Sequence, residues 1–162
     1  MASRLPSRLL TFQKVIANLL KRRIRPTEPN SVLIAHHLLL GDTLMLTPLL
    51  AKIREQYPQA RIVLCSPKAI TRLYEFKPYS VEAISYDPRD ISTLREVCFN
   101  GPYDLALVPG DNRFSYLAYA AGSRWIRAFA GDTPSYKNHL IDELIPYLDT
   151  PATWYDMNTL LI

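Results

Sequence analysis

The sequence has few of the residues that build metal centres, phosphate loops or membrane spans. Its two cysteines, Cys65 and Cys98, stand apart without a CxxC pair or a Cys/His cluster, so we expect no metal site and a reducing compartment. Its five glycines form neither GxGxxG nor a GxxxxGKS or GxxxxGKT loop, which disfavours a dinucleotide-binding domain of the usual kind and a P-loop. No apolar run reaches the roughly 18 residues that a membrane-spanning helix needs.

Positive charge is concentrated at one end of the chain. Seven of the 19 Lys and Arg residues lie within residues 1–30 against the single acid Glu28, a net charge of +6, which leaves 12 bases, 14 acids and a net charge of −2 for the remainder. The basic pI therefore describes a segment, and we expect no nucleic-acid partner. The length of 162 residues, with 48% hydrophobic and 21% charged residues, fits one globular domain.

Residues 1–30 combine a basic amphipathic helix with a linker. Apolar residues recur at helical spacing on one face, with most of the bases opposite; they are Leu5, Leu9, Phe12, Ile16, Leu19 and Leu20. Two alternatives stay open: residues 1–25 rest on an anionic membrane surface, or the helix docks on its own domain with a solvated basic face. We expect a cytoplasmic protein, peripheral on the inner face of the cytoplasmic membrane under the first alternative.

From residue 31 onward, short apolar runs alternate with segments of helical periodicity. The predicted strands cover residues 32–35, 61–65, 81–86, 104–108 and 125–129, and the predicted helices cover 43–57, 69–76, 91–99 (with Asp90 as N-cap) and 114–121. This alternation predicts an α/β, Rossmann-like parallel sheet with helices on both faces over residues 31–162.

Gly41 and Asp42 lie where the first predicted strand hands over to its helix. Ligands of open parallel sheets bind beyond the carboxyl ends of the strands, at such handovers. Glycine permits a tight or positive-φ turn and a close approach of a ligand to the backbone. Asp42 either caps the following helix, worth about 1 kcal/mol, or points into the crevice, and the pattern alone leaves both open.

Two stretches carry a family resemblance. The sequences VLIAHHLLLGDTLMLTPLLAKIREQYPQARIVL and YDLALVPGDNRFSYLAYAAGSRWIRAFAG resemble the N-terminal domain of glycosyltransferase family 9, the ADP-heptose:lipopolysaccharide heptosyltransferases. The shared features are Gly-Asp after the first strand, Thr-Pro early in the helix, and Tyr-Pro before the second strand. The resemblance spans roughly residue 31 to the C-terminus and implies one half of a two-domain GT-B enzyme.

The resemblance implies a metal-independent, inverting transfer of heptose from ADP-heptose onto a lipopolysaccharide precursor or other glycolipid acceptor. Asp42 stands at the position of the expected general base, which takes the proton of the acceptor hydroxyl. We expect its neighbours Gly41 and Thr43 beside the acceptor. No cofactor is implied, and the ADP-sugar is expected to bind mainly a C-terminal domain.

A second candidate site, Asp111-Asn112-Arg113, follows the fourth predicted strand. Its polar side chains suit an anionic sugar acceptor, and the Arg113 guanidinium can bind a carboxylate or phosphate in a bidentate manner. Asp111 alternatively caps the next helix. Lys137 stands where the family often carries basic acceptor contacts.

The loop after the first strand departs from the family pattern. His36 replaces a usual Lys or Arg, and Leu38-Leu39 replace a usual Ser-Ser. His36 is either a core histidine at a strand end or an acceptor contact. The acceptor therefore does not follow from the family.

Family 9 enzymes have two Rossmann-like domains, roughly twice this length. The sequence is therefore interpreted as the acceptor-side half of such an enzyme, truncated or split, with a C-terminal domain as partner. A non-catalytic Rossmann-like binding module held at a membrane surface is the alternative. A small α/β nucleotide-binding protein is disfavoured by the missing phosphate loop.

Overall fold

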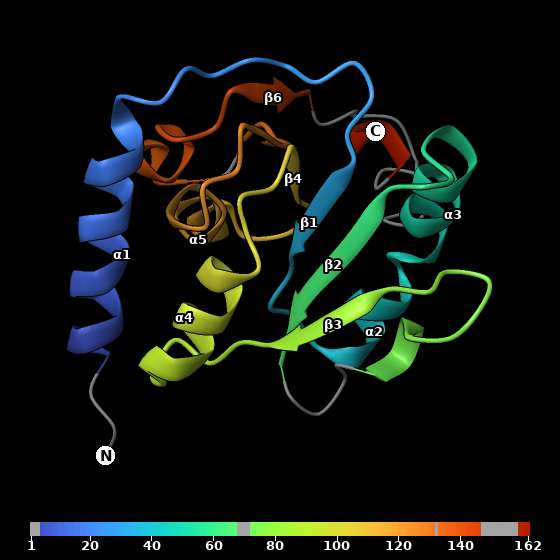
Figure 1. The fold of residues 1–162 in the computed structure, drawn as a ribbon, viewed down its shortest axis with the longest axis horizontal. Coiled ribbons are helices and arrows are strands. Elements are labelled where there is room, and N and C mark those ends of the chain that lie inside the picture. Colours follow the sequence, from blue (N-terminus) through green and yellow to red (C-terminus); the bar gives the residue numbers. More distant parts are fainter. Residues whose placement is uncertain (1–3, 68–71, 132, 147–158) are drawn as a thin grey trace.

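A six-stranded, wholly parallel sheet forms the centre of the molecule (Figure 1). The computed structural model describes residues 4–67, 72–131, 133–146 and 159–162. The sheet order is β3-β2-β1-β4-β5-β6. Its strands are β1 (Ser31–Ala35), β2 (Arg61–Ser66), β3 (Glu82–Ser85), β4 (Leu105–Val108), β5 (Trp125–Phe129) and β6 (Glu143–Ile145). The five predicted strands are confirmed, whereas β6 was not predicted.

Two hydrophobic clusters lie on opposite faces of the sheet, because successive strand residues point to opposite sides. In β1, Leu33 and Ala35 belong to one cluster, and Val32 and Ile34 belong to the other. The first face is covered by α1 (Leu5–Leu19), α4 (Ile91–Phe99) and α5 (Ser115–Ala120), and the second by α3 (Thr47–Gln56). The Rossmann-like prediction of helices on both faces is confirmed.

The single helix predicted for residues 43–57 is wrong. The segment divides into α2 (Leu40–Leu44) and α3, and Thr47 and Pro48 open α3. Proline lacks an N–H and suits the first turn of a helix, so the chain restarts there. The helix begins at Leu40 and not at Thr43, which places Gly41 and Asp42 inside its first turn.

Other predicted helices fare differently. The predicted Asp90 cap of α4 is confirmed, because its carboxylate accepts the Ser92 N–H at 2.9 Å. The helix predicted for residues 114–121 is observed as α5, and a 3₁₀ turn, η2 (Asn112–Phe114), directly precedes it. The predicted helix at residues 69–76 lies partly outside the described residues, and residues 72–74 form a 3₁₀ turn.

Helix α1 docks on its own domain with an unexpected face. Its buried residues are Ser7, Val15 and Asn18, and it packs against α5 and α4. The predicted apolar face points outward instead. Among the described residues, no helix is long and apolar enough to span a membrane.

Candidate functional site

The candidate site lies at the carboxyl ends of β1 and β4, which are neighbours at the centre of the sheet. The chain leaves β1 toward α3 on one face and leaves β4 toward α5 on the other, which is where open parallel sheets bind their ligands. These loops touch, since a Cβ added at Gly110 would lie 2.8 Å from Cδ1 of Leu38. The order of the strands thus joins the two segments that the sequence singled out.

Asp42 occupies the third position of α2 and is exposed. One carboxylate oxygen accepts the backbone N–H of Leu39 at 3.3 Å. Leu39, and not Asp42, is the N-cap residue. The carboxylate thus satisfies one free amide of the first turn and keeps lone pairs directed at solvent. The Asp42 carboxylate therefore caps the first turn of α2 from its third position and is also exposed beyond the carboxyl end of β1.

Gly41 lies inside α2, and its φ is not positive. Of the roles that a glycine permits at this handover, a positive-φ turn is therefore not the one that Gly41 has. A Cβ built at Gly41 would meet nothing within 4 Å. The protein's own packing does not require glycine here, and the backbone beside Asp42 is open to a ligand.

His36 and Thr43 are buried beneath Asp42, with 3% and 0% of their surface exposed. Nε2 of His36 lies 2.9 Å from Oγ1 of Thr43, which in turn donates to the carbonyl of Leu39 at 3.0 Å. Burial lowers the pKa of His36 to about 4, against the opposing charge of Asp42. His36 is thus the core histidine of the two alternatives, and it fixes the first turn of α2 together with Thr43.

Asp111, Arg113 and Lys137 are brought together by the structure. The Asp111 carboxylate accepts the Arg113 N–H at 2.9 Å and Nε of Arg113 at 2.7 Å, and Nζ of Lys137 lies 3.8 Å away. Burial opposes ionisation of Asp111, but the hydrogen bonds and charges of Arg113 and the charge of Lys137 hold its pKa below the usual value. Asp111 therefore caps η2 and also organises two cations.

Asn112 is buried and ties this loop to the next one. Its Nδ2 donates to the carbonyl of Phe129 at 2.9 Å and to Oδ1 of Asn138 at 2.7 Å. Asn138 belongs to the 3₁₀ turn η3 (Ser135–Asn138), which also carries Lys137. The Arg113 side chain, by contrast, is 64% exposed. Asn112 therefore holds the loop, whereas the Arg113 side chain is largely exposed beside Asp111.

An aromatic group beside these loops was missed by sequence reasoning. The ring centroids of His37 and Phe114 lie 5.4 Å apart, and those of His37 and Tyr86 lie 6.0 Å apart. Burial raises the pKa of Tyr86 to about 12 and lowers that of His37. His37 is the second residue after β1, and Tyr86 is the first residue after β3. Their positions just beyond strand ends were the signal that could have found them.

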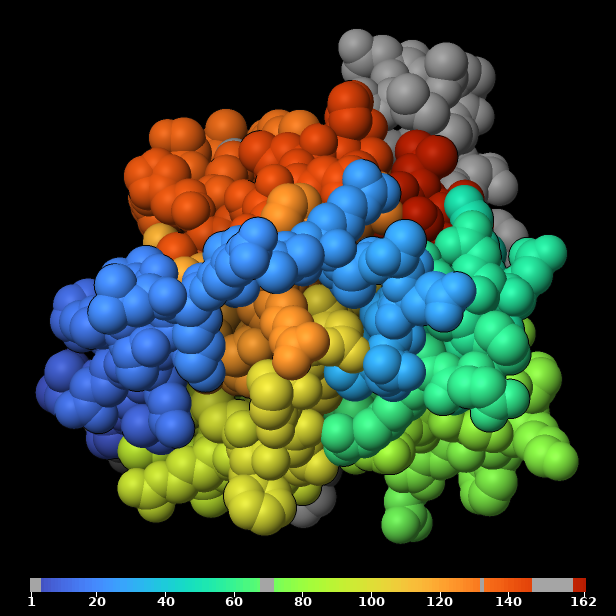
Figure 2. All heavy atoms as spheres, turned by 45° about the horizontal axis from the view of Figure 1, so that its top comes forward, coloured from blue at the N-terminus to red at the C-terminus, as the bar shows by residue number. Residues whose placement is uncertain are grey.

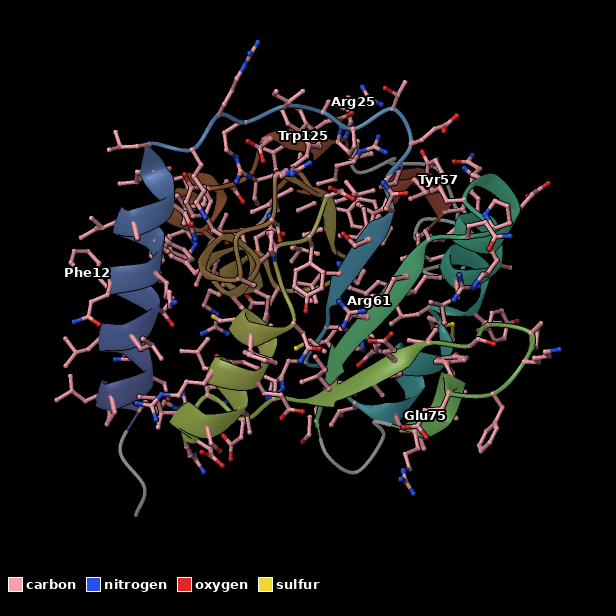
Figure 3. The ribbon with its side chains drawn as sticks, viewed as in Figure 1. Phe12, Arg25, Tyr57, Arg61, Glu75 and Trp125 are labelled. Carbon is pink, nitrogen blue, oxygen red and sulfur yellow. The ribbon has the colours of Figure 1, made fainter. Side chains whose placement is uncertain are left out.

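A cavity of about 300 Å³ lies at the amino ends of β4 and β5, at the other end of the strands from Asp42. Its lining includes Arg25, Tyr57, Trp125 and Arg127, three of which are labelled along the top of the molecule in Figure 3. Arg127 is already bound there by Glu143 at 3.1 Å and by the carbonyl of Ile162 at 2.9 Å. The cavity does not belong to the candidate site.

Comparison with solved structures gives two informative matches. The crystal structure of the glycosyl transferase family 9 from Veillonella parvula DSM 2008 superposes with a TM-score of 0.69 at 17% identity, over 86% of this chain and 41% of that chain. The E. coli ADP-heptose lps heptosyltransferase II gives a TM-score of 0.56 at 21% identity, over 72% and 34%. The fold is similar to that of family 9 glycosyltransferases. This chain therefore spans less than half the length of either structure.

Sequence comparisons add nothing to this likeness. No family model matches the chain, and no curated protein matches it. The structural match covers most of the chain at low identity, so the similarity lies in the order and packing of strands and helices.

Proposed function

We propose that this chain is the acceptor-side domain of a glycosyltransferase that moves a sugar from an ADP-sugar to a glycolipid or other glycan acceptor, with Asp42 as general base. The observation that carries the proposal is the placement of Asp42, whose exposed carboxylate lies just beyond the carboxyl end of the central strand β1. The fold that contains this sheet is similar to that of a family 9 enzyme. The resemblance implies a heptose donor, whereas the acceptor is proposed only as a glycolipid or other glycan, because His36 and Leu38-Leu39 depart from the family pattern.

The proposed step is an inverting displacement. Asp42 takes the proton of the acceptor hydroxyl while its oxygen bonds to the anomeric carbon of the sugar. The bond between that carbon and the diphosphate oxygen breaks on the opposite side, and ADP leaves with the electron pair. The exposed lone pairs of Asp42 suit proton acceptance, and the Leu39 N–H, 3.3 Å from a carboxylate oxygen, holds its orientation.

Several residues would position this base without touching the acceptor. Thr43 is linked to His36 and to the Leu39 carbonyl, and the Tyr74 hydroxyl donates to the Thr43 carbonyl at 3.1 Å. These bonds join α2 to the end of β1 and to the segment after β2. A carboxylate on so short a helix needs such support, because misplacement of a catalytic group by about 1 Å costs roughly a hundredfold in rate.

The second loop would bind the acceptor. Arg113 and Lys137 are the cations nearest to Asp111, and a carboxylate or phosphate of an acceptor would compete with Asp111 for the exposed Arg113 guanidinium. Leu39 and Leu40 flank the site with exposures of 80% and 52%, which favours an acceptor, or a second domain, with apolar surface. The ADP-sugar would bind mainly that second domain.

The test is sugar transfer from ADP-heptose to lipopolysaccharide precursors by this chain, alone and with a candidate C-terminal domain. Asp42→Asn is expected to abolish the turnover of the complete pair, because an amide cannot take the proton. Asp90→Asn is the matched control: Asp90 is an exposed capping carboxylate of α4, and asparagine retains its capping function. Transfer that is indifferent to Asp42→Asn contradicts the proposal.

A further inference from the structure

Helix α1 presents an apolar stripe to solvent. We define the outer stripe as the residues that share this face: Leu5, Leu9, Phe12, Ile16, Leu19 and Leu20. Their exposures range from 49% at Ile16 to 97% at Leu20. Figure 1 and Figure 2 show α1 at the rim of the molecule, and Phe12 points away from the domain in Figure 3. An apolar face of this extent on a soluble domain marks an interaction site.

Polar contacts on the inner face fix this orientation of α1. Nδ2 of Asn18 donates to the carbonyls of Tyr119 and Ala120 at 2.9 and 3.3 Å, where α5 ends. Beyond the helix, Arg23 pairs with Asp142 and lies 4.5 Å above the Tyr119 ring. Turning the stripe inward would break these contacts, so its exposure is built into the fold.

Exposed basic side chains lie along the same segment as the stripe, most of them on other sides of the helix. No acidic residue precedes Glu28 in the chain, and the exposed bases near α1 are Arg4, Arg8, Lys14, Lys21 and Arg22. Within residues 4–30, Arg23 and Arg25 lie within ion-pair distance of acids of the domain, Asp142 and Glu143. The segment therefore combines exposed apolar area with a positive field that the domain itself does not neutralise.

We propose that the outer stripe docks α1 on an anionic membrane surface. A helix lying in the interface buries its apolar face among the acyl chains, and each nearby Lys or Arg adds attraction to anionic headgroups. A second copy of this chain is a poorer occupant, because stripe-to-stripe packing would bring two sets of unneutralised bases together. The negative charge of a lipid surface complements both features at once.

The experiment is cosedimentation of the purified protein with vesicles of phosphatidylcholine, with and without about 30% phosphatidylglycerol. Binding is expected with the anionic vesicles and is expected to weaken as salt shortens the range of electrostatic attraction. Phe12→Gln is expected to reduce the partition coefficient about tenfold, equivalent to about 1.4 kcal/mol. Circular dichroism checks that the variant remains folded.

Phe76→Gln is the matched control, because Phe76 is a phenylalanine with 79% exposure, and its neighbour Glu75 lies across the molecule from Phe12 in Figure 3. It is expected to bind vesicles like the original protein. Absence of binding to anionic vesicles, or equal losses in both variants, overturns the proposal. So does a dimer in sedimentation velocity that Phe12→Gln dissociates, which would assign the stripe to self-association. Vesicle binding by this chain, with no sugar transfer by its pair with the C-terminal domain, would contradict the proposed function alone.

Discussion

Nε2 of His36 lies 2.9 Å from Oγ1 of Thr43, with both side chains buried under the turn that carries Asp42. Because the Thr43 hydroxyl donates to the Leu39 carbonyl at 3.0 Å, its oxygen is free to accept, and the proton of a neutral His36 belongs on Nε2. His36 is thereby a neutral ring that supports the helix from within the domain.

The burial of His36 predicts acid sensitivity. Its pKa in the folded protein is lowered from 6.5 to about 4 by burial, so between these values the unfolded chain binds a proton that the folded chain does not. The contribution of the neutral His36 to the free energy of unfolding is therefore fully present above about pH 6.5. It is lost as the pH falls toward 4, by up to about 3 kcal/mol. Urea unfolding at several pH values measures this loss.

His36→Gln is expected to flatten that pH dependence, since glutamine can donate to Thr43 without titrating. The exposed His139 provides the control, and His139→Gln is expected to leave the profile unchanged. A profile of His36→Gln that matches the original protein would show that other groups cause the acid sensitivity.

Gly41→Ala separates a structural role of this glycine from a role in binding. Since Gly41 is helical and an added Cβ meets nothing within 4 Å, the free energy of unfolding is expected to rise by zero to about 1 kcal/mol. Transfer activity is expected to fall, because the methyl group obstructs the approach of the acceptor to the backbone beside Asp42. Unfolding curves and kcat/KM measure the two effects.

Gly101→Ala is the contrasting variant, since its Cβ would lie 2.2 Å from the Ala121 carbonyl oxygen. It is expected to lose stability, with no specific effect on transfer by the folded fraction. If Gly41→Ala retains full activity, no ligand closely approaches that backbone.

Asn18 is expected to contribute to the stability of the whole domain. Asn18→Ala removes these donors from the Tyr119 and Ala120 carbonyls, which still accept the Gly122 N–H and the Cys98 thiol, so the expected loss is about 1 kcal/mol. Urea unfolding gives the loss, and hydrogen exchange is expected to show faster exchange in α1. Gln13→Ala, an exposed change on the same helix, is expected to have little effect. Equal stability of the two variants would rule out the anchoring role.

Local patterns were sufficient to predict most of the sheet. The strands β1, β2, β4 and β5 are short apolar runs, and Asp90 carries the residue type of a helix cap, so their environment is encoded within a few residues. The break at Thr47-Pro48 was missed because apolar residues continue through it at helical spacing. Strand β6 was missed because it is three residues long and is exposed or half-buried, with no apolar run to mark it.

The candidate site was predicted in its parts but not in its assembly. Gly41-Asp42 and Asp111–Arg113 were found because polar residues follow apolar strands. Their juxtaposition depends on β1 and β4 being neighbours, which is a property of the chain's topology. Helical periodicity likewise could not predict which face of α1 is buried, because contacts of Asn18 and Arg23 with residues distant in the sequence decide it.

The effects of Arg113 on folding and on acceptor binding can be measured separately. Its exposed ion pair with Asp111 is expected to contribute less than about 1 kcal/mol to folding, so Arg113→Gln is expected to fold normally. Loss of a charge-assisted contact is expected to raise KM for a phosphate- or carboxylate-bearing acceptor roughly tenfold, with kcat little changed. Arg124→Gln is the control, because the Arg124 side chain is 65% exposed, against 64% for Arg113, and also pairs with an aspartate, Asp104, at 3.2 Å. Arg124 and Asp104 directly precede β5 and β4, so their ion pair lies at the amino ends of the strands, away from the candidate site. If both variants give the original KM, the acceptor does not contact Arg113; if both raise it equally, the effect reflects net charge and not the site.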